Sequence, residues 1–141
     1  MKEACFMTGQ CTFCRLAKKE APASYIYEDK EVAAFLDMKP INEGHTLVIP
    51  KNHYENIYEI PEEEVAHLFR IVKKVTYAVK KGVNAEGISI IQNNERAAGQ
   101  VVFHLHVHII PRFWKPKSCR PREICESSEL DTVAAKIRQF V

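Results

Sequence analysis

The segment from Phe103 to Pro111 constrains this chain most, because three histidines alternate in it with apolar residues. Side chains two residues apart lie on the same face of a β-strand. The alternation therefore predicts a strand with imidazoles on one face and apolar side chains facing a core. The imidazole face comprises His104, His106 and His108, and the core face comprises Phe103, Leu105, Val107 and Ile109. Proline has no N–H to donate, so the strand is expected to end at Pro111.

The composition is typical of one globular domain. The chain has 141 residues, of which 46% are apolar and 27% charged, so a single domain spanning 1–141 is expected. The net charge of +2 is too small to indicate nucleic-acid or membrane binding. No apolar run approaches the roughly 20 residues of a membrane span. The N-terminus lacks an apolar signal region, which predicts a cytoplasmic protein.

The cysteines indicate a metal or redox site rather than a disulfide framework. Their number, five, is odd, and nothing in the sequence suggests export. Cys11 and Cys14 have the spacing of metal ligands or of a redox pair. The other three, Cys5, Cys119 and Cys125, have no evident partners and are expected to be free thiols.

One long helix is expected from Pro61 to Lys81. Its apolar residues recur at the spacing of a single helical face, and they are Val65, Leu68, Phe69, Val72, Val75, Thr76 and Val79. Acidic residues at its start and lysines at its end suit the helix dipole. Gly82 would stop the helix, and His67 lies off the apolar face, so it is expected to be solvated.

The remaining segments predict short strands and two shorter helices. Strands are expected at 25–28, 32–36, 45–49, 88–92 and 103–110, and helices at 15–20 and 130–141, the latter capped by Ser127 or Ser128. Residues 1–10 and 114–127 are expected to lie over the surface as loops. The predicted class is α+β: about five mostly antiparallel strands, one long central helix and a C-terminal helix.

The stretch from His104 to Ile110 resembles the signature of the histidine-triad (HIT) family of nucleotide hydrolases and transferases, in which three histidines alternate with apolar residues. The segment from Asp37 to His53 is similar to the family's first block, and Ala98-Gly99-Gln100 to its second. The resemblance covers roughly Cys11 to Phe113. It implies a HIT-like fold and a homodimer whose sheets join across the interface.

The resemblance also implies a substrate that contains a nucleoside monophosphate. The middle histidine would attack the α-phosphate, and water would hydrolyse the nucleotidyl-histidine. The matching positions are His106 for the nucleophile, His108 and His45 for its supporting histidines, Asp37 for the ribose hydroxyls, and Asn93 and Gln100 for phosphate-side contacts. A purine base is the family expectation. The residue after Gln100 is commonly Ser or Thr in relatives, whereas here it is Val101, so one phosphate contact is expected to be missing.

Phosphate chemistry explains why imidazoles suit this task. A neutral imidazole avoids the repulsion that an anionic nucleophile meets at a phosphate, and it can form a covalent intermediate. Its second nitrogen must then be held as N–H by an acceptor. The loop 93–100, in which Gly99 permits close backbone approach, is expected to supply oriented donors to the phosphate.

Cys11 and Cys14 supply half of a tetrahedral zinc site. His53 and His104 are the candidates for the other two ligands, and the resemblance agrees, because relatives with this cysteine pair bind structural zinc at the matching positions. The alternative is two unpaired thiols on a loop.

Three other functions remain as alternatives. In a metallohydrolase the three clustered histidines would bind catalytic zinc, although the outer pair would lie too far apart for one ion. The triad could instead belong to a non-catalytic purine-nucleotide-binding or interaction protein. A zinc-ribbon nucleic-acid binder is disfavoured by the single cysteine pair and the absence of a basic stripe. The sequence leaves the leaving group open among an amine, a second nucleotide, an aminoacyl group and a sulfate.

Overall fold

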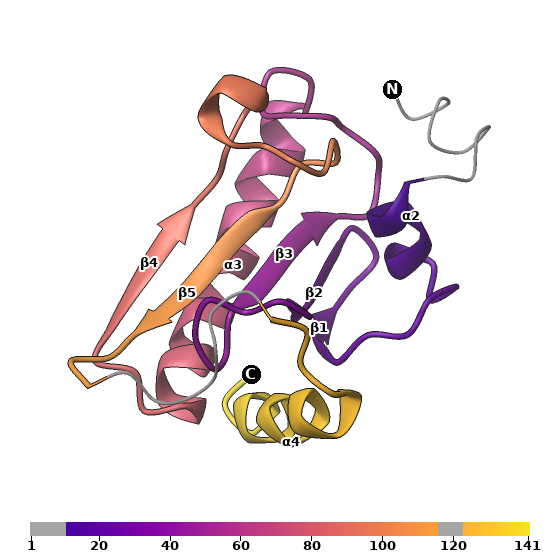
Figure 1. Ribbon diagram of the computed structural model, residues 1–141. Helices are drawn as coiled ribbons and strands as arrows, with labels where there is room; N and C mark the ends of the chain where they lie inside the picture. Colours follow the sequence, from indigo (N-terminus) through magenta and orange to yellow (C-terminus); the bar gives the residue numbers. More distant parts are fainter. Residues whose placement is uncertain (1–10, 116–122) are drawn as a thin grey trace.

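The computed structural model describes residues 11–115 and 123–141, and the predictions for residues 1–10, Cys5 and Cys119 lie outside these ranges (Figure 1). Its elements are α2 (Thr12–Ala17), β1 (Tyr25–Glu28), β2 (Val32–Leu36), β3 (Thr46–Pro50), α3 (Glu62–Gly82), β4 (Gly87–Ile91), the 3-10 helix η1 (Arg96–Ala98), β5 (Val107–Arg112) and α4 (Ser127–Arg138). The five strands form one sheet in the order β1-β2-β3-β5-β4, and each neighbouring pair is antiparallel. The predicted α+β class is confirmed.

Helices cover both faces of the sheet. The long helix α3 and the C-terminal α4 pack on one face, where α3 contributes Leu68, Val72, Val75 and Val79 to a core shared with β2, β3 and β5. On the other face, Phe13 and Leu16 of α2 pack against β2 and β3. Since a strand between two packed layers has no solvent face, all five residues of β2 are buried.

Helix α3 follows the predicted pattern with three corrections. Phe69, expected on the buried face, is 40% exposed. His67 is not simply solvated, because its Nε2 lies 2.8 Å from Asp29 Oδ2 in the β1–β2 turn. Gly82 lies inside α3 rather than after it, and a Cβ there would come within 2.7 Å of Ile137 Cα. The glycine therefore allows α4 to approach α3 closely.

Strand β5 starts later than the alternation predicts. Only Val107 and the residues after it pair with β3 or β4, whereas the N–H of Leu105 donates to the carbonyl of Tyr54 at 2.7 Å. Phe103, expected in the core, is 36% exposed, and Leu105 is buried as predicted. Only His108 of the three histidines therefore lies on the strand.

Pro111 lies within β5 instead of ending it. Strand β3 pairs with β5 only from Val107 to Ile109, so no β3 residue faces Pro111. On that side the carbonyl of Pro111 accepts a hydrogen bond from Asn42 Nδ2 at 2.8 Å. A proline is tolerated where no neighbouring strand needs its N–H.

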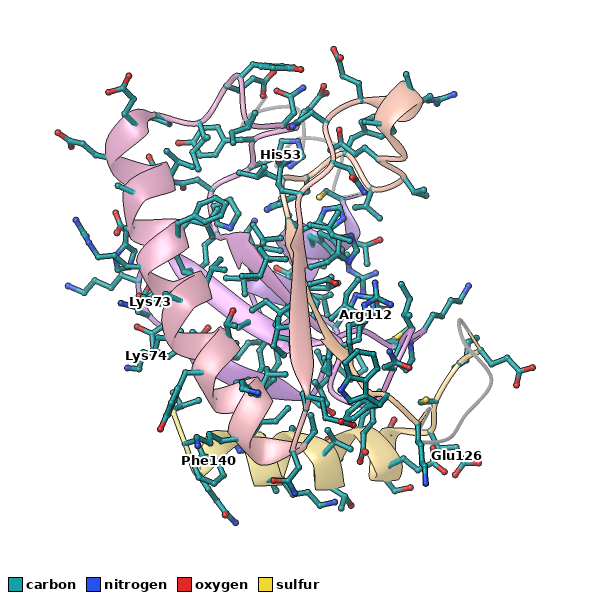
Figure 2. The ribbon with its side chains drawn as sticks, turned by 90° about the vertical axis from the view of Figure 1, so that its left-hand side faces the viewer. His53, Lys73, Lys74, Arg112, Glu126 and Phe140 are labelled. Carbon is teal, nitrogen blue, oxygen red and sulfur yellow. The ribbon has the colours of Figure 1, made fainter. Side chains whose placement is uncertain are left out.

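Helix α4 begins at Ser127, three residues before the predicted start. Its N-cap is Glu126, without a side-chain cap, so the expected serine cap is wrong. Figure 2 shows Glu126 and Phe140 at one end of the molecule and His53 at the other. Among the described residues, no helix is long and apolar enough to cross a membrane.

Candidate functional site

The first cluster, called here the Cys/His cluster, comprises Cys11, Cys14, His53 and His104. His104 Nδ1 lies 3.4 Å from Cys11 Sγ, 3.5 Å from Cys14 Sγ and 3.2 Å from His53 Nδ1. His53 Nδ1 lies 3.5 Å from Cys14 Sγ. Helix α2 with its N-cap, the segment after β3 and the segment before β5 therefore bring the two cysteines and the two candidate histidines together.

These separations fit a tetrahedral zinc ion. With Zn–S bonds of about 2.3 Å and Zn–N bonds of about 2.0 Å, tetrahedral angles require S···N separations of roughly 3.5 Å and N···N separations of roughly 3.3 Å. His104 Nε2–H donates to the Pro50 carbonyl at 2.8 Å, which leaves Nδ1 with its lone pair toward the cluster. Burial lowers the pKa of His104 to about 4, so its imidazole is neutral at pH 7.

The oxidation state of Cys14 decides whether the set can bind metal. Cys14 is disulfide-bonded in the structure, whereas the sequence predicted a metal ligand or one member of a redox pair with Cys11. A disulfide sulfur has no thiolate to offer, so metal binding requires Cys14 in its reduced form. Cys11, by contrast, is a free cysteine.

His106 lies beside this cluster and is 8% exposed. Its Nδ1 is 2.7 Å from the His104 carbonyl oxygen, so Nδ1–H donates and Nε2 keeps its lone pair. Burial lowers the pKa of His106 despite this hydrogen bond, which favours the neutral ring at pH 7. The ring packs edge-to-face on Phe13 and His108, with centroid distances of 5.1 Å and 4.9 Å.

His45 and His108 form a second arrangement, called here the histidine relay. The N–H of Ile41 donates to His45 Nδ1 at 3.0 Å, so the proton of His45 is on Nε2. That Nε2 lies 3.0 Å from His108 Nδ1 and donates to it. His108, in turn, carries its proton on Nε2. One main-chain N–H thus sets the tautomers of two imidazoles.

Asp37 lies beside the hydrogen bond between His45 and His108. Its Oδ1 accepts from the N–H of Lys39 at 2.8 Å, and its Oδ2 is 3.6 Å from His45 Nε2. Asp37 and His45 both line a cavity of about 360 Å³ between the segment after β2 and helix α4. The predicted contact between Asp37 and a ribose stays a prediction.

The three alternating histidines do not converge on one ion. His104 points its Nδ1 at the cysteines, whereas His106 donates from Nδ1 to a carbonyl. Within residues 11–115 and 123–141, the two groups able to hold a metal are the Cys/His cluster and the set Asp37, His45 and His108. This geometry disfavours the catalytic-zinc alternative.

The loop between β4 and β5 contains the other predicted substrate contacts. Gly99 has φ +92°, and an added Cβ would lie 3.9 Å from Asn93 Nδ2, so backbone conformation rather than space requires glycine. Gln100 is 3% exposed. Val101 is 82% exposed, and its effect on phosphate binding stays a prediction.

The side chain of Gln100 holds this loop together. Its Oε1 accepts from the N–H of Glu95 at 2.7 Å, and its Nε2 donates to the carbonyls of Glu55 and Val102 at 2.5 and 3.1 Å. Both amide protons are therefore used within the protein. A phosphate contact from this side chain, as predicted, would require breaking one of these bonds.

Sequence reasoning missed Phe13, Ile41 and Pro50. Phe13 stands between the two cysteines, and that position was the available signal. Ile41 and Pro50 act through main-chain atoms, which every residue type carries. No side-chain pattern could therefore have identified them.

Comparison with protein families places this geometry in a known context. The model of the HIT domain matches residues 18–115. An uncharacterised HIT-like protein of Methanocaldococcus jannaschii is 48% identical over 73% of this chain and 79% of its own length. The adenylylsulfatase of Arabidopsis thaliana is 33% identical over 99% of this chain and 73% of its own. The adenosine 5'-monophosphoramidase of Candida albicans is 40% identical over 74% of this chain and 71% of its own length.

Solved structures of histidine triad proteins have the same fold as this chain. A histidine triad nucleotide-binding protein of Sulfolobus tokodaii superposes with a TM-score of 0.88 and 42% identity, covering 92% of this chain and 90% of that one. A zinc-bound histidine triad family protein of Mycobacterium smegmatis superposes with a TM-score of 0.80 and 34% identity, covering 94% and 96%. The second structure shows that this fold can carry zinc.

Proposed function

The chain belongs to the HIT domain family, and we propose that it hydrolyses AMP derivatives at the α-phosphate through a nucleotidyl intermediate on His106. One observation carries the proposal: His106 donates its Nδ1–H to the His104 carbonyl at 2.7 Å. The opposite nitrogen, Nε2, then carries the lone pair of a neutral ring. A neutral nitrogen nucleophile is suited to attack on an anionic phosphate.

The proposed reaction has two steps. Nε2 of His106 attacks the α-phosphorus, an N–P bond forms, and the bond from phosphorus to the leaving group breaks. Water then attacks the same phosphorus and gives up a proton, the N–P bond breaks with its electron pair returning to Nε2, and AMP is released. The relay supports both steps, because His108 presents an Nε2–H donor beside His106, with ring centroids 4.9 Å apart.

The substrate class is proposed from what two relatives share. One relative is named an adenosine 5'-monophosphoramidase and the other an adenylylsulfatase. Their names point to different leaving groups, an amine and a sulfate, on the same adenylyl unit. We therefore propose that the substrates of this enzyme carry an adenylyl group. Asp37 would bind the ribose, and Asn93 and the Gly99 backbone would bind the phosphate.

The Cys/His cluster fits zinc, and we propose that it binds zinc as a structural ion. Zinc there would cross-link Cys11 and Cys14 to His53 and His104, which come from three separate segments. None of these four residues is assigned to the reacting phosphate. Reduced cysteines are consistent with the cytoplasmic location predicted from the sequence.

We also propose a homodimer. Strand β4 is an edge strand, and its Ile90 and Ile91 are 48% and 36% exposed. An exposed apolar edge favours pairing with another chain. Sedimentation at micromolar concentration should show a dimer, and a species of only 16.2 kDa would exclude it.

The location of the covalent intermediate tests the proposed function. Purified protein is mixed with an AMP phosphoramidate, quenched in acid within one turnover, and digested for mass spectrometry. An adduct of AMP mass on the peptide containing His106 is expected. An adduct on another residue would overturn the assignment, and binding of AMP without turnover of amide, anhydride or sulfate derivatives would favour the non-catalytic alternative.

A further inference from the structure

We infer that the Cys/His cluster orients the nucleophile, with Phe13 and the main chain of His104 as positioning residues between the metal ligands and His106. The inference rests on the proposed function for the role of His106. It goes beyond a structural zinc, because metal binding would then control the direction of the attacking nitrogen as well as the stability of the fold.

The first connection runs through His104. Its Nδ1 belongs to the cluster, its Nε2–H is bound to the Pro50 carbonyl at 2.8 Å, and its own carbonyl accepts from His106 Nδ1–H at 2.7 Å. His104 is fully buried. A displacement of the His104 ring would therefore move the acceptor that sets the orientation of the His106 ring.

The second connection runs through Phe13, which stands between the two cysteine ligands. Its ring is 7% exposed and packs edge-to-face on His104 at 5.9 Å and on His106 at 5.1 Å. Helix α2, which carries Phe13, has only six residues. A helix this short has little stability of its own, so tertiary contacts such as the cluster must hold it in place.

The histidine relay provides an internal contrast. His45 accepts a hydrogen bond from the N–H of Ile41, and its own Nε2–H donates to His108, which fixes the orientation of both rings. Neither residue belongs to the Cys/His cluster. Release of the metal should therefore disturb His106 and leave the relay in place.

Histidine NMR tests this contrast without turnover. Full-length protein with ¹⁵N-labelled histidines is compared under reducing conditions in its zinc-loaded form and after zinc removal by a chelator. The His106 Nδ1–H signal should be present with zinc and lost or averaged without it, while the His45 Nε2–H signal persists. Persistence of both signals, or loss of both together, would overturn the inference.

A pair of variants tests the same idea in the zinc-loaded protein, where unfolding of the metal-free form cannot interfere. Phe13→Leu removes the ring that packs on His106. Phe35→Leu is the matched control, because Phe35 is also buried in the same hydrophobic core cluster and packs edge-to-face on Phe13, with ring centroids 5.8 Å apart. Zinc content is measured for both variants and should remain about one ion per chain.

The expected result is a difference in the rate of nucleotidyl-His106 formation. Phe13→Leu should reduce kcat about tenfold or more, since small misplacements of a reacting group are costly. Phe35→Leu should change kcat much less. Equal losses in the two variants would overturn the positioning role. If the wild type fails to turn over any AMP derivative, the proposed function fails, and the NMR comparison still decides whether the cluster orients His106.

Discussion

The Cys/His cluster and the histidine relay lie side by side, yet they solve the same problem in different ways. Both must hold imidazoles in one orientation. The relay does so with the protein alone, since the N–H of Ile41 donates to His45 Nδ1 and His45 Nε2–H donates to His108 Nδ1. The cluster instead brings two sulfurs and two nitrogens within 4.8 Å of one another, and His104 Nδ1 lies 3.2 to 3.5 Å from the other three.

Of the two regions, the Cys/His cluster is the one expected to depend on a cation. Lone pairs gathered in a buried space repel one another unless a proton or metal lies between them. The relay already contains its protons, so its geometry does not require an ion. His106 receives its orientation from the cluster side, through His104, and its neighbouring donor from the relay side, through His108.

The largest expected effect is on the residue between the two regions. His106→Ala should reduce turnover of an AMP amide by about four orders of magnitude or more, because the covalent route is lost while the pocket remains. Steady-state kinetics measures the loss. Equilibrium AMP binding and circular dichroism should stay near wild type, and retention of full activity would contradict the assignment.

Breaking the cluster should mainly affect stability. Cys14→Ala, in reducing buffer with zinc, should cost roughly 3 kcal/mol and lower Tm by about 10 °C, because a cross-link among three segments is lost. Differential scanning calorimetry and metal analysis check this expectation. A metal-free wild type that melts at the same temperature as the zinc-loaded protein would show that the cluster does not depend on a cation.

Breaking the histidine relay should lower the catalytic rate without weakening metal binding. His45→Ala should reduce kcat about a hundredfold, less than His106→Ala, because a supporting group assists the attack without making it. The zinc content should be unchanged. A loss of zinc in this variant would contradict the independence of the two regions.

The smallest expected effect concerns a charged contact that uses no metal. Burial raises the pKa of Asp29, but hydrogen bonds from the Glu31 and Val32 N–H groups, His67 and Tyr27 outweigh it and lower the pKa to about 2. A depressed carboxylate pKa stabilises the fold above the unfolded value near 3.9, and that stabilisation is lost as pH falls toward 2.

Asp29→Asn should therefore cost about 1 kcal/mol at pH 7, after allowance for the partial exposure of the carboxylate. The difference from wild type should shrink between about pH 4 and pH 2. Urea unfolding across this range measures it, and chelator should leave it unchanged. A cost that is independent of pH would mean that Asp29 acts through packing rather than charge.

Several elements of the fold could be predicted because their causes are local. The hairpin strands 25–28 and 32–36 match the structure at both ends, since residues of high strand propensity flank a charged turn. The long helix was located to within one residue at each end from its apolar face. Ser127 or Ser128 as a cap and Gly82 as a stop were wrong: the N-cap of α4 is Glu126, and Gly82 lies inside α3, where it packs against Ile137.

The histidine segment shows the limit of periodicity. Alternation predicted one strand with three equivalent imidazoles, but the chain joins the sheet only at Val107. His104 and His106 lie in the preceding segment, where the metal ligands and the carbonyl acceptor need a different backbone. Alternation cannot distinguish a strand paired in the sheet from an unpaired segment before it, since the residue types do not show whether a neighbouring strand is present.

Side-chain chemistry and spacing in the sequence were enough to predict the α+β class, to show the resemblance to the HIT family, and to name Cys11 and Cys14 with His53 and His104 as candidate metal ligands. Tertiary structure alone decided the tautomers of His45, His106 and His108. Those depend on the N–H of Ile41 and the carbonyl of His104, main-chain atoms that every residue type shares and that only folding brings within hydrogen-bond distance.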